Sequence, residues 1–182
     1  MKTILFTLLI GLSYFTSMAQ TTTFDCDRYK IEFPGKFKFD SRSKTHFFHY
    51  TEKAELGEMV TLNIDVEAFT RKGNKHQNIL ITHRTKDGLT SEKVDLLMKN
   101  AYKPLKFEEV LETKDYTLRG GIHGKVSKCK NTAYGQVSYN FQFRFKVKNG
   151  ICNLKYDFNQ DEKALLKFDY DNFFSHIKFT EK

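Results

Sequence analysis

The sequence lacks tryptophan and has only two prolines and ten glycines in its 182 residues. Collagen-like chains need glycine at every third position, so this class is excluded. Beyond the first twenty residues, no apolar run approaches the roughly 20 residues that a membrane-spanning helix needs. The multi-span membrane class is therefore excluded, and so is the coiled coil, which requires sustained apolar heptads.

Signatures of catalysis and metal binding are also missing. The sequence contains no G-x-S-x-G, H-E-x-x-H or C-x-x-C motif. His46 and His49 are three residues apart on an expected strand, so their side chains face opposite ways and cannot easily share one metal ion. We expect no metal, no cofactor and no recognisable catalytic motif. An enzyme whose site is assembled from distant residues stays open as an alternative.

Aromatic residues and positive charge are abundant. The chain has 18 Phe and 9 Tyr, too many for a disordered protein that buries nothing. Its formal net charge is +8. The length suits one domain with a hydrophobic core of its own.

The first residues are typical of an export signal. Lys2 precedes an apolar run over residues 4–15, and Ser17-Met18-Ala19 offers the small residues that a signal peptidase recognises. We predict a signal peptide over residues 1–19 and a single exported domain over residues 20–182, periplasmic or extracellular. Loss of Lys2 lowers the net charge by one, to +7.

Export permits disulfides, and the mature chain would hold three cysteines, Cys26, Cys129 and Cys152. The dipeptide Asn149-Gly150 predicts a tight hairpin that separates Cys129 from Cys152 by about 33 Å of strand, whereas a disulfide needs Cα atoms within about 7 Å. We therefore predict a Cys26–Cys129 disulfide and a buried Cys152 thiol. A catalytic Cys152 is the less favoured reading, because no histidine lies near it in sequence.

Alternation with a period of two predicts most of the chain to be strand. The clearest case is residues 136–147, where Val137, Tyr139, Phe141, Phe143, Phe145 and Val147 alternate with polar residues. The other expected strands cover residues 29–33, 46–51, 59–69, 79–85, 107–118, 122–130, 151–158 and 177–179. Gly120-Gly121 resembles a phosphate loop only superficially, because the spacing is short and no helix follows, so we expect a turn there.

Two segments have helical spacing. Thr90 or Ser91 can cap a helix with apolar residues at 94, 97, 98 and 101 that Pro104 ends, and residues 166–177 repeat the pattern. Hairpin-connected strands with two principal helices predict the α+β class: an antiparallel sheet with the helices packed on it.

The element order resembles that of the PsbP/Mog1-like fold group, as do residues 31–37 (IEFPGKF) and 173–179 (FFSHIKF). Domains of that group often open with an extended segment that runs into Pro and an aromatic residue, and they close on a helix leading into a short strand. The resemblance implies an α/β/α sandwich and an accessory or assembly role. One departure is Phe37, where the group commonly has Trp.

A basic stripe is the candidate binding surface. The predicted hairpin places Arg144 opposite Lys155, with Lys146 and Lys148 on the same outward face, although like charges opposed across strands are mildly destabilising. Such a face suits an anionic partner, but a solvated surface would look the same. The intervening aromatics point into the core and cannot stack on bases, so no nucleic acid is expected.

These features predict an exported, non-catalytic binding or accessory protein of the cell envelope. Its partner would be an unidentified protein or an anionic envelope component. The alternatives are a secreted ligand carrier and a hydrolase-like enzyme with an unrecognised site.

Overall fold

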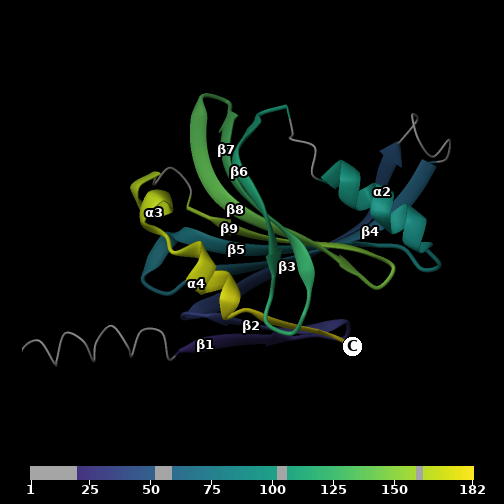
Figure 1. Cartoon of the computed structure of the whole chain (residues 1–182), viewed down its shortest axis with the longest axis horizontal. Helices are drawn as coiled ribbons and strands as arrows, with labels where there is room; N and C mark the ends of the chain where they lie inside the picture. Colours follow the sequence, from purple (N-terminus) through teal and green to yellow (C-terminus); the bar gives the residue numbers. More distant parts are fainter. Residues whose placement is uncertain (1–19, 52–58, 102–105, 159–161) are drawn as a thin grey trace, which may run out of the picture.

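The computed structural model describes residues 20–51, 59–101, 106–158 and 162–182 (Figure 1). Within them, ten strands form two antiparallel sheets, a small one in the order β1-β2-β10 and a large one in the order β3-β4-β5-β9-β8-β7-β6. The strands are β1 (Thr21–Asp25), β2 (Tyr29–Pro34), β3 (Phe37–Thr51), β4 (Met59–Arg71), β5 (Asn74–Thr85), β6 (Glu108–Thr117), β7 (His123–Ala133), β8 (Gln136–Val147), β9 (Gly150–Asp157) and β10 (Lys178–Glu181). The helices are α2 (Ser91–Ala101), α3 (Glu162–Lys167) and α4 (Tyr170–Ser175). The predicted signal peptide lies outside the described residues.

The predicted α+β class is wrong, because the described chain is mainly β. The helices have 11, 6 and 6 residues, too little to form a layer on each face of the sheet. The second predicted helix divides at Phe168-Asp169, where the Asp169 carboxylate accepts the Asn172 N–H at 3.0 Å and caps α4 as a separate helix. The α/β/α sandwich that the PsbP/Mog1-like resemblance implied is therefore not the architecture.

The two faces of the large sheet differ in chemistry. Cys152 and Ile151 are neighbours on β9 and point to opposite faces. Cys152 belongs to the main core, in which the aromatic face of the large sheet packs against the small sheet, α3 and α4. Ile151 belongs to a smaller cluster with Leu62 and the apolar side of α2. Figure 1 shows α2 at one end of the molecule and α3 with α4 at the other.

The turn between β8 and β9 corrects the predicted hairpin. Val147 pairs with Gly150 and Arg144 pairs with Asn153, so the register differs by two residues from the expected one. Lys148 and Asn149 form the turn, and Asn149 adopts a φ of 60°. Gly150 is the first residue of β9. A Cβ atom at this position would lie 2.1 Å from the carbonyl oxygen of Arg84 on β5, so the position requires glycine. The glycine thus serves the close approach of two strands and not the turn itself.

The Gly120-Gly121 segment is a turn between β6 and β7, as predicted. Both glycines have positive φ, 109° and 88°. No helix in the described part of the chain is long and apolar enough to cross a membrane.

Candidate functional site

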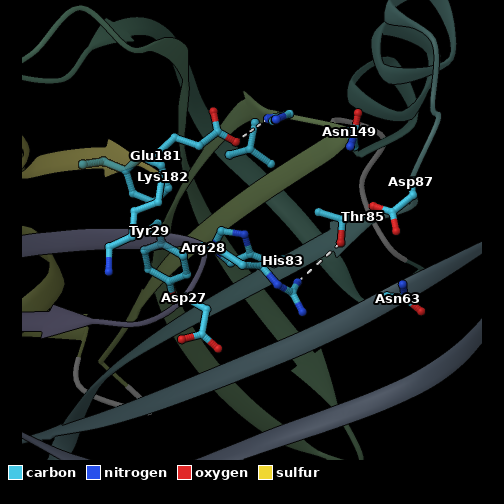
Figure 2. A pocket seen from close by; sticks show the side chains of 13 residues that line it. Asp27, Arg28, Tyr29, Asn63, His83, Thr85, Asp87, Asn149, Glu181 and Lys182 are labelled. Atoms are coloured by element: carbon cyan, nitrogen blue, oxygen red, sulfur yellow. Dashed lines mark hydrogen bonds between the residues drawn. The ribbon is translucent and has the colours of Figure 1, made fainter.

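A pocket of about 370 Å³ lies where the ends of the two sheets meet (Figure 2). Four chain segments line it: the approach to β2, strands β4 and β5 with the turn that follows β5, the β8–β9 turn, and the end of β10. The lining residues are Asp27, Arg28, Tyr29, Asn63, His83, Thr85, Asp87, Val147, Lys148, Asn149, Phe179, Glu181 and Lys182. We call this site the inter-sheet pocket.

Backbone hydrogen bonds hold these segments together. The Lys182 N–H donates to the Arg28 carbonyl at 2.9 Å, which extends the β2–β10 pairing to the end of the chain. The Lys86 N–H donates to the Asn149 carbonyl at 3.0 Å and ties the end of β5 to the β8–β9 turn. The walls are therefore positioned by the sheets and not by loose loops.

Three nearly parallel rings form the buried wall of the pocket. The Tyr29 ring stacks on His83 at 4.3 Å and on Phe179 at 5.1 Å between centroids. The Tyr29 hydroxyl donates to Glu67 Oε2 at 2.8 Å, and both residues are buried. Burial, reinforced by the Glu67 carboxylate, raises the pKa of Tyr29 well above its ordinary value, so this phenol stays protonated.

His83 contacts Cys152, its register partner on β9. The His83 Nε2 atom lies 3.4 Å from the Cys152 sulfur, a pair that resembles a nucleophile and its base. Burial, however, raises the pKa of Cys152 well above its ordinary value. The thiol is therefore neutral at physiological pH, whereas a nucleophilic cysteine needs its thiolate. This agrees with the prediction of a buried Cys152.

The inter-sheet pocket is lined by three carboxylates and three cations. Its lining includes the cations Arg28, Lys148 and Lys182 and the carboxylates of Asp27, Asp87 and Glu181. Two of these cations form ion pairs with carboxylates that do not line the pocket: Arg28 pairs with Asp65, and Lys182 pairs with Asp25. Of the lining carboxylates, Asp27 and Asp87 have no ion-pair partner in the described chain.

The four residues of the predicted basic stripe do not form one exposed surface. Arg144 is 8% exposed and lies 3.8 Å from the Glu108 carboxylate, which curls over the same face of the sheet. Lys146 pairs with Asp95 of α2, and Lys155 pairs with Asp157 at 2.8 Å. Only Lys148 joins the inter-sheet pocket. Lys155 faces Gln142 and not Arg144, so the predicted repulsion does not occur.

All three cysteines are free thiols, and the predicted Cys26–Cys129 disulfide is not formed in the structure. Cys26 lies in the β1–β2 turn, while Cys129 is fully buried on β7. Burial, with the neighbouring Glu108 carboxylate, raises the pKa of the Cys129 thiol to about 12.

No grouping of three metal-ligating side chains occurs among the described residues. The side chains of His46, His49 and His76 lie outside them. His123, on the rim of the large sheet, has its Nδ1 atom 2.8 Å from the Thr117 hydroxyl.

Sequence reasoning missed most of the inter-sheet pocket, including Asp27, Arg28 and Tyr29. One signal was present: His83 continues the apolar alternation of Ile79 and Ile81, which places it on the core face of its strand. No protein-family model matches the chain, and no curated protein sequence matches it significantly. The fold and the pocket describe a two-sheet β protein with a charged pocket between the sheets.

Proposed function

We propose that this chain is an exported, non-catalytic binding protein that holds a small polar molecule carrying an amine in its inter-sheet pocket. The observation that carries the proposal is that Asp27 and Asp87 line the pocket without an ion-pair partner in the described chain, whereas the lining cations Arg28 and Lys182 are already paired with carboxylates. Carboxylates without such partners favour a cationic ligand.

The pocket offers three kinds of contact to such a ligand. Asp27 and Asp87 form no ion pair within the described chain and would accept hydrogen bonds from an ammonium group. Asn63, Thr85 and Asn149 add neutral polar groups. The stacked aromatic wall closes the buried side of the pocket and supplies a small apolar surface, because its rings are only 1%, 3% and 5% exposed.

The hydrolase-like alternative has less support. The Cys152 thiol, which contacts His83 on the buried side of the pocket, is neutral and buried. A binding role uses the pocket as it stands, without ionising that thiol.

A titration with matched amino and hydroxyl sugars tests the proposal. We expect glucosamine, followed by heteronuclear NMR, to shift the amide signals of Tyr29, His83 and Asn149 and to bind more tightly than glucose. An Asp27→Asn/Asp87→Asn double variant should lose about tenfold in affinity, because hydrogen bonds to charged groups contribute about 1.5–3 kcal/mol.

Glu109→Gln on edge strand β6 is the matched control and should bind as the wild type does. Equal affinity for glucose and glucosamine, or equal binding by the double variant, would show that the pocket is not an amine site. The absence of any shift with glucosamine, spermidine and putrescine would reject the proposed function.

A further inference from the structure

A second pocket, of about 220 Å³, lies away from the inter-sheet pocket. It is bounded by the Pro34-Gly35 turn, the end of β4 at Arg71, and the junction between α3 and α4. No residue lines both pockets. We call it the aromatic pocket.

Its floor consists of four aromatic rings that pack on one another. Phe37, Tyr156 and Phe173 are 7%, 1% and 8% exposed. Tyr156 stacks on Phe168 at 4.9 Å, and Phe168 contacts Phe173 at 5.4 Å between centroids. Because each ring is held by its neighbours, the floor is a preformed apolar surface that suits another ring.

Arg71 stands at the mouth of this pocket. It pairs with Phe37 across β3 and β4, so both side chains lie on the same face of the sheet. Its Nη1 atom donates to Gln77 Oε1 and lies 3.4 Å from the Tyr156 hydroxyl. These contacts orient the guanidinium, and its remaining N–H groups have no partner in the described chain.

Positive charge prevails around the mouth. Lys167, in the last turn of α3, lines the pocket, is exposed and forms no ion pair with the described residues. Lys36 and Lys72 are the sequence neighbours of the lining residues Phe37 and Arg71, and the Lys72 N–H donates to the Lys36 carbonyl at 2.9 Å. Asp169 is the one lining carboxylate, and it is already engaged in capping α4.

We propose that the aromatic pocket binds a small carboxylate that carries an aromatic ring. The ring would lie on Phe37, Phe168 and Phe173, and the carboxylate would accept hydrogen bonds from Arg71 and Lys167. A cavity of roughly 150 Å³ is enough for benzene, so 220 Å³ leaves room for a ring with a short acid group. Guanidinium is well suited to this role, because its fork of donors matches the two oxygens of a carboxylate.

This site takes ligands of the opposite charge to those of the inter-sheet pocket, so it goes beyond the proposed function. The two proposals are independent, so a result that contradicts one does not contradict the other. Phenylacetate should shift the amide signals of Phe37, Phe168 and Phe173 and leave those of Tyr29 and His83 unchanged.

Three chemical probes separate the contributions to binding. We expect phenylacetate to bind at least tenfold more tightly than 2-phenylethanol, which keeps the ring without the charge, and than acetate, which keeps the charge without the ring. Raising the salt concentration should weaken phenylacetate binding and leave that of 2-phenylethanol unchanged.

Three variants test the assigned residues. Arg71→Gln should weaken phenylacetate binding about tenfold, Arg71→Lys should weaken it less, and Lys167→Gln should weaken it several-fold. Lys86→Gln, at the opposite end of β5, is the matched control and should bind as the wild type does. Both test positions are exposed, so unchanged circular dichroism would confirm that the variants fold. Equal affinities for phenylacetate and 2-phenylethanol, or unchanged binding in both Gln variants, would overturn the proposal.

Discussion

Asn140 carries two polar side-chain atoms into the interior without a hydrogen-bond partner for either. The residue is 0% exposed, and both its Oδ1 and Nδ2 atoms lack partners. It lies on the polar face of β8, between Cys129 of β7 and Asp157 of β9. Removing an amide from water without compensation costs about 1–3 kcal/mol, so this position opposes folding.

Replacing Asn140 by the similarly shaped Leu should therefore raise the free energy of unfolding by about 1–3 kcal/mol. Urea unfolding followed by far-UV circular dichroism measures the change. Asn131→Leu, on partly exposed β7 surface, is the control and should change stability by no more than about 0.5 kcal/mol. Destabilisation by Asn140→Leu would contradict this account and show that the amide is satisfied in solution.

The polar face of β8 also explains why the sequence wrongly predicted an exposed Arg144. Alternation correctly assigned Phe141, Phe143 and Phe145 to the core, because adjacent side chains on a strand point to opposite faces. It could not reveal that the Glu108 carboxylate lies over the other face, where it accepts a hydrogen bond from the Gln142 side-chain amide and pairs with Arg144. An outward direction on a strand is not the same as contact with water.

At the scale of elements, the β8–β9 hairpin shows how a neighbouring strand can determine a residue. Asn149-Gly150 has the composition of a two-residue hairpin loop, yet Gly150 is the first residue of β9. Its lack of a side chain is required by β5, whose Arg84 carbonyl occupies the space of a Cβ atom. The sequence pattern predicted the hairpin correctly and its register wrongly.

Gly150→Ala should consequently lower the free energy of unfolding by about 3 kcal/mol or more, because the backbones of β5 and β9 must separate to admit a methyl group. Gly73→Ala is the comparison. Gly73 has a φ of 84° and nothing within 4 Å of a Cβ, so only left-handed strain of about 1–2 kcal/mol applies. Equal losses in the two variants, measured by urea unfolding, would show that the strand contact does not limit position 150.

At the scale of the whole molecule, one aromatic core joins both sheets and the two C-terminal helices. The buried Tyr29–Glu67 hydrogen bond adds a polar connection between β2 of the small sheet and β4 of the large one. Because neither sheet buries its apolar face without the other, we expect them to unfold together.

Tyr29→Phe should lower the stability of the whole protein by about 1.5–3 kcal/mol, since it removes a hydrogen bond to a buried carboxylate. Near-UV and far-UV circular dichroism should report one shared midpoint in the wild type and in the variant. Tyr134→Phe, fully exposed in the β7–β8 turn, should leave the midpoint unchanged. Separate midpoints for the two signals would refute a single cooperative unit.

The sequence by itself predicted most of the strands and the aromatic face of β8, because alternation depends only on local backbone geometry. It missed β1 and the part of β3 before residue 46, and it did not show that Asp65 and Glu67 of β4 are buried. It also indicated the α2 segment, whose Val94, Leu97 and Met98 are buried as the spacing predicts. Only the tertiary structure determined the short lengths of the helices and the contacts between polar side chains. The inter-sheet pocket combines segments near residues 28, 84, 148 and 181 because β10 returns to pair with β2 beside the end of β5. Such contacts arise from the pairing of strands distant in sequence, and no local pattern encodes them.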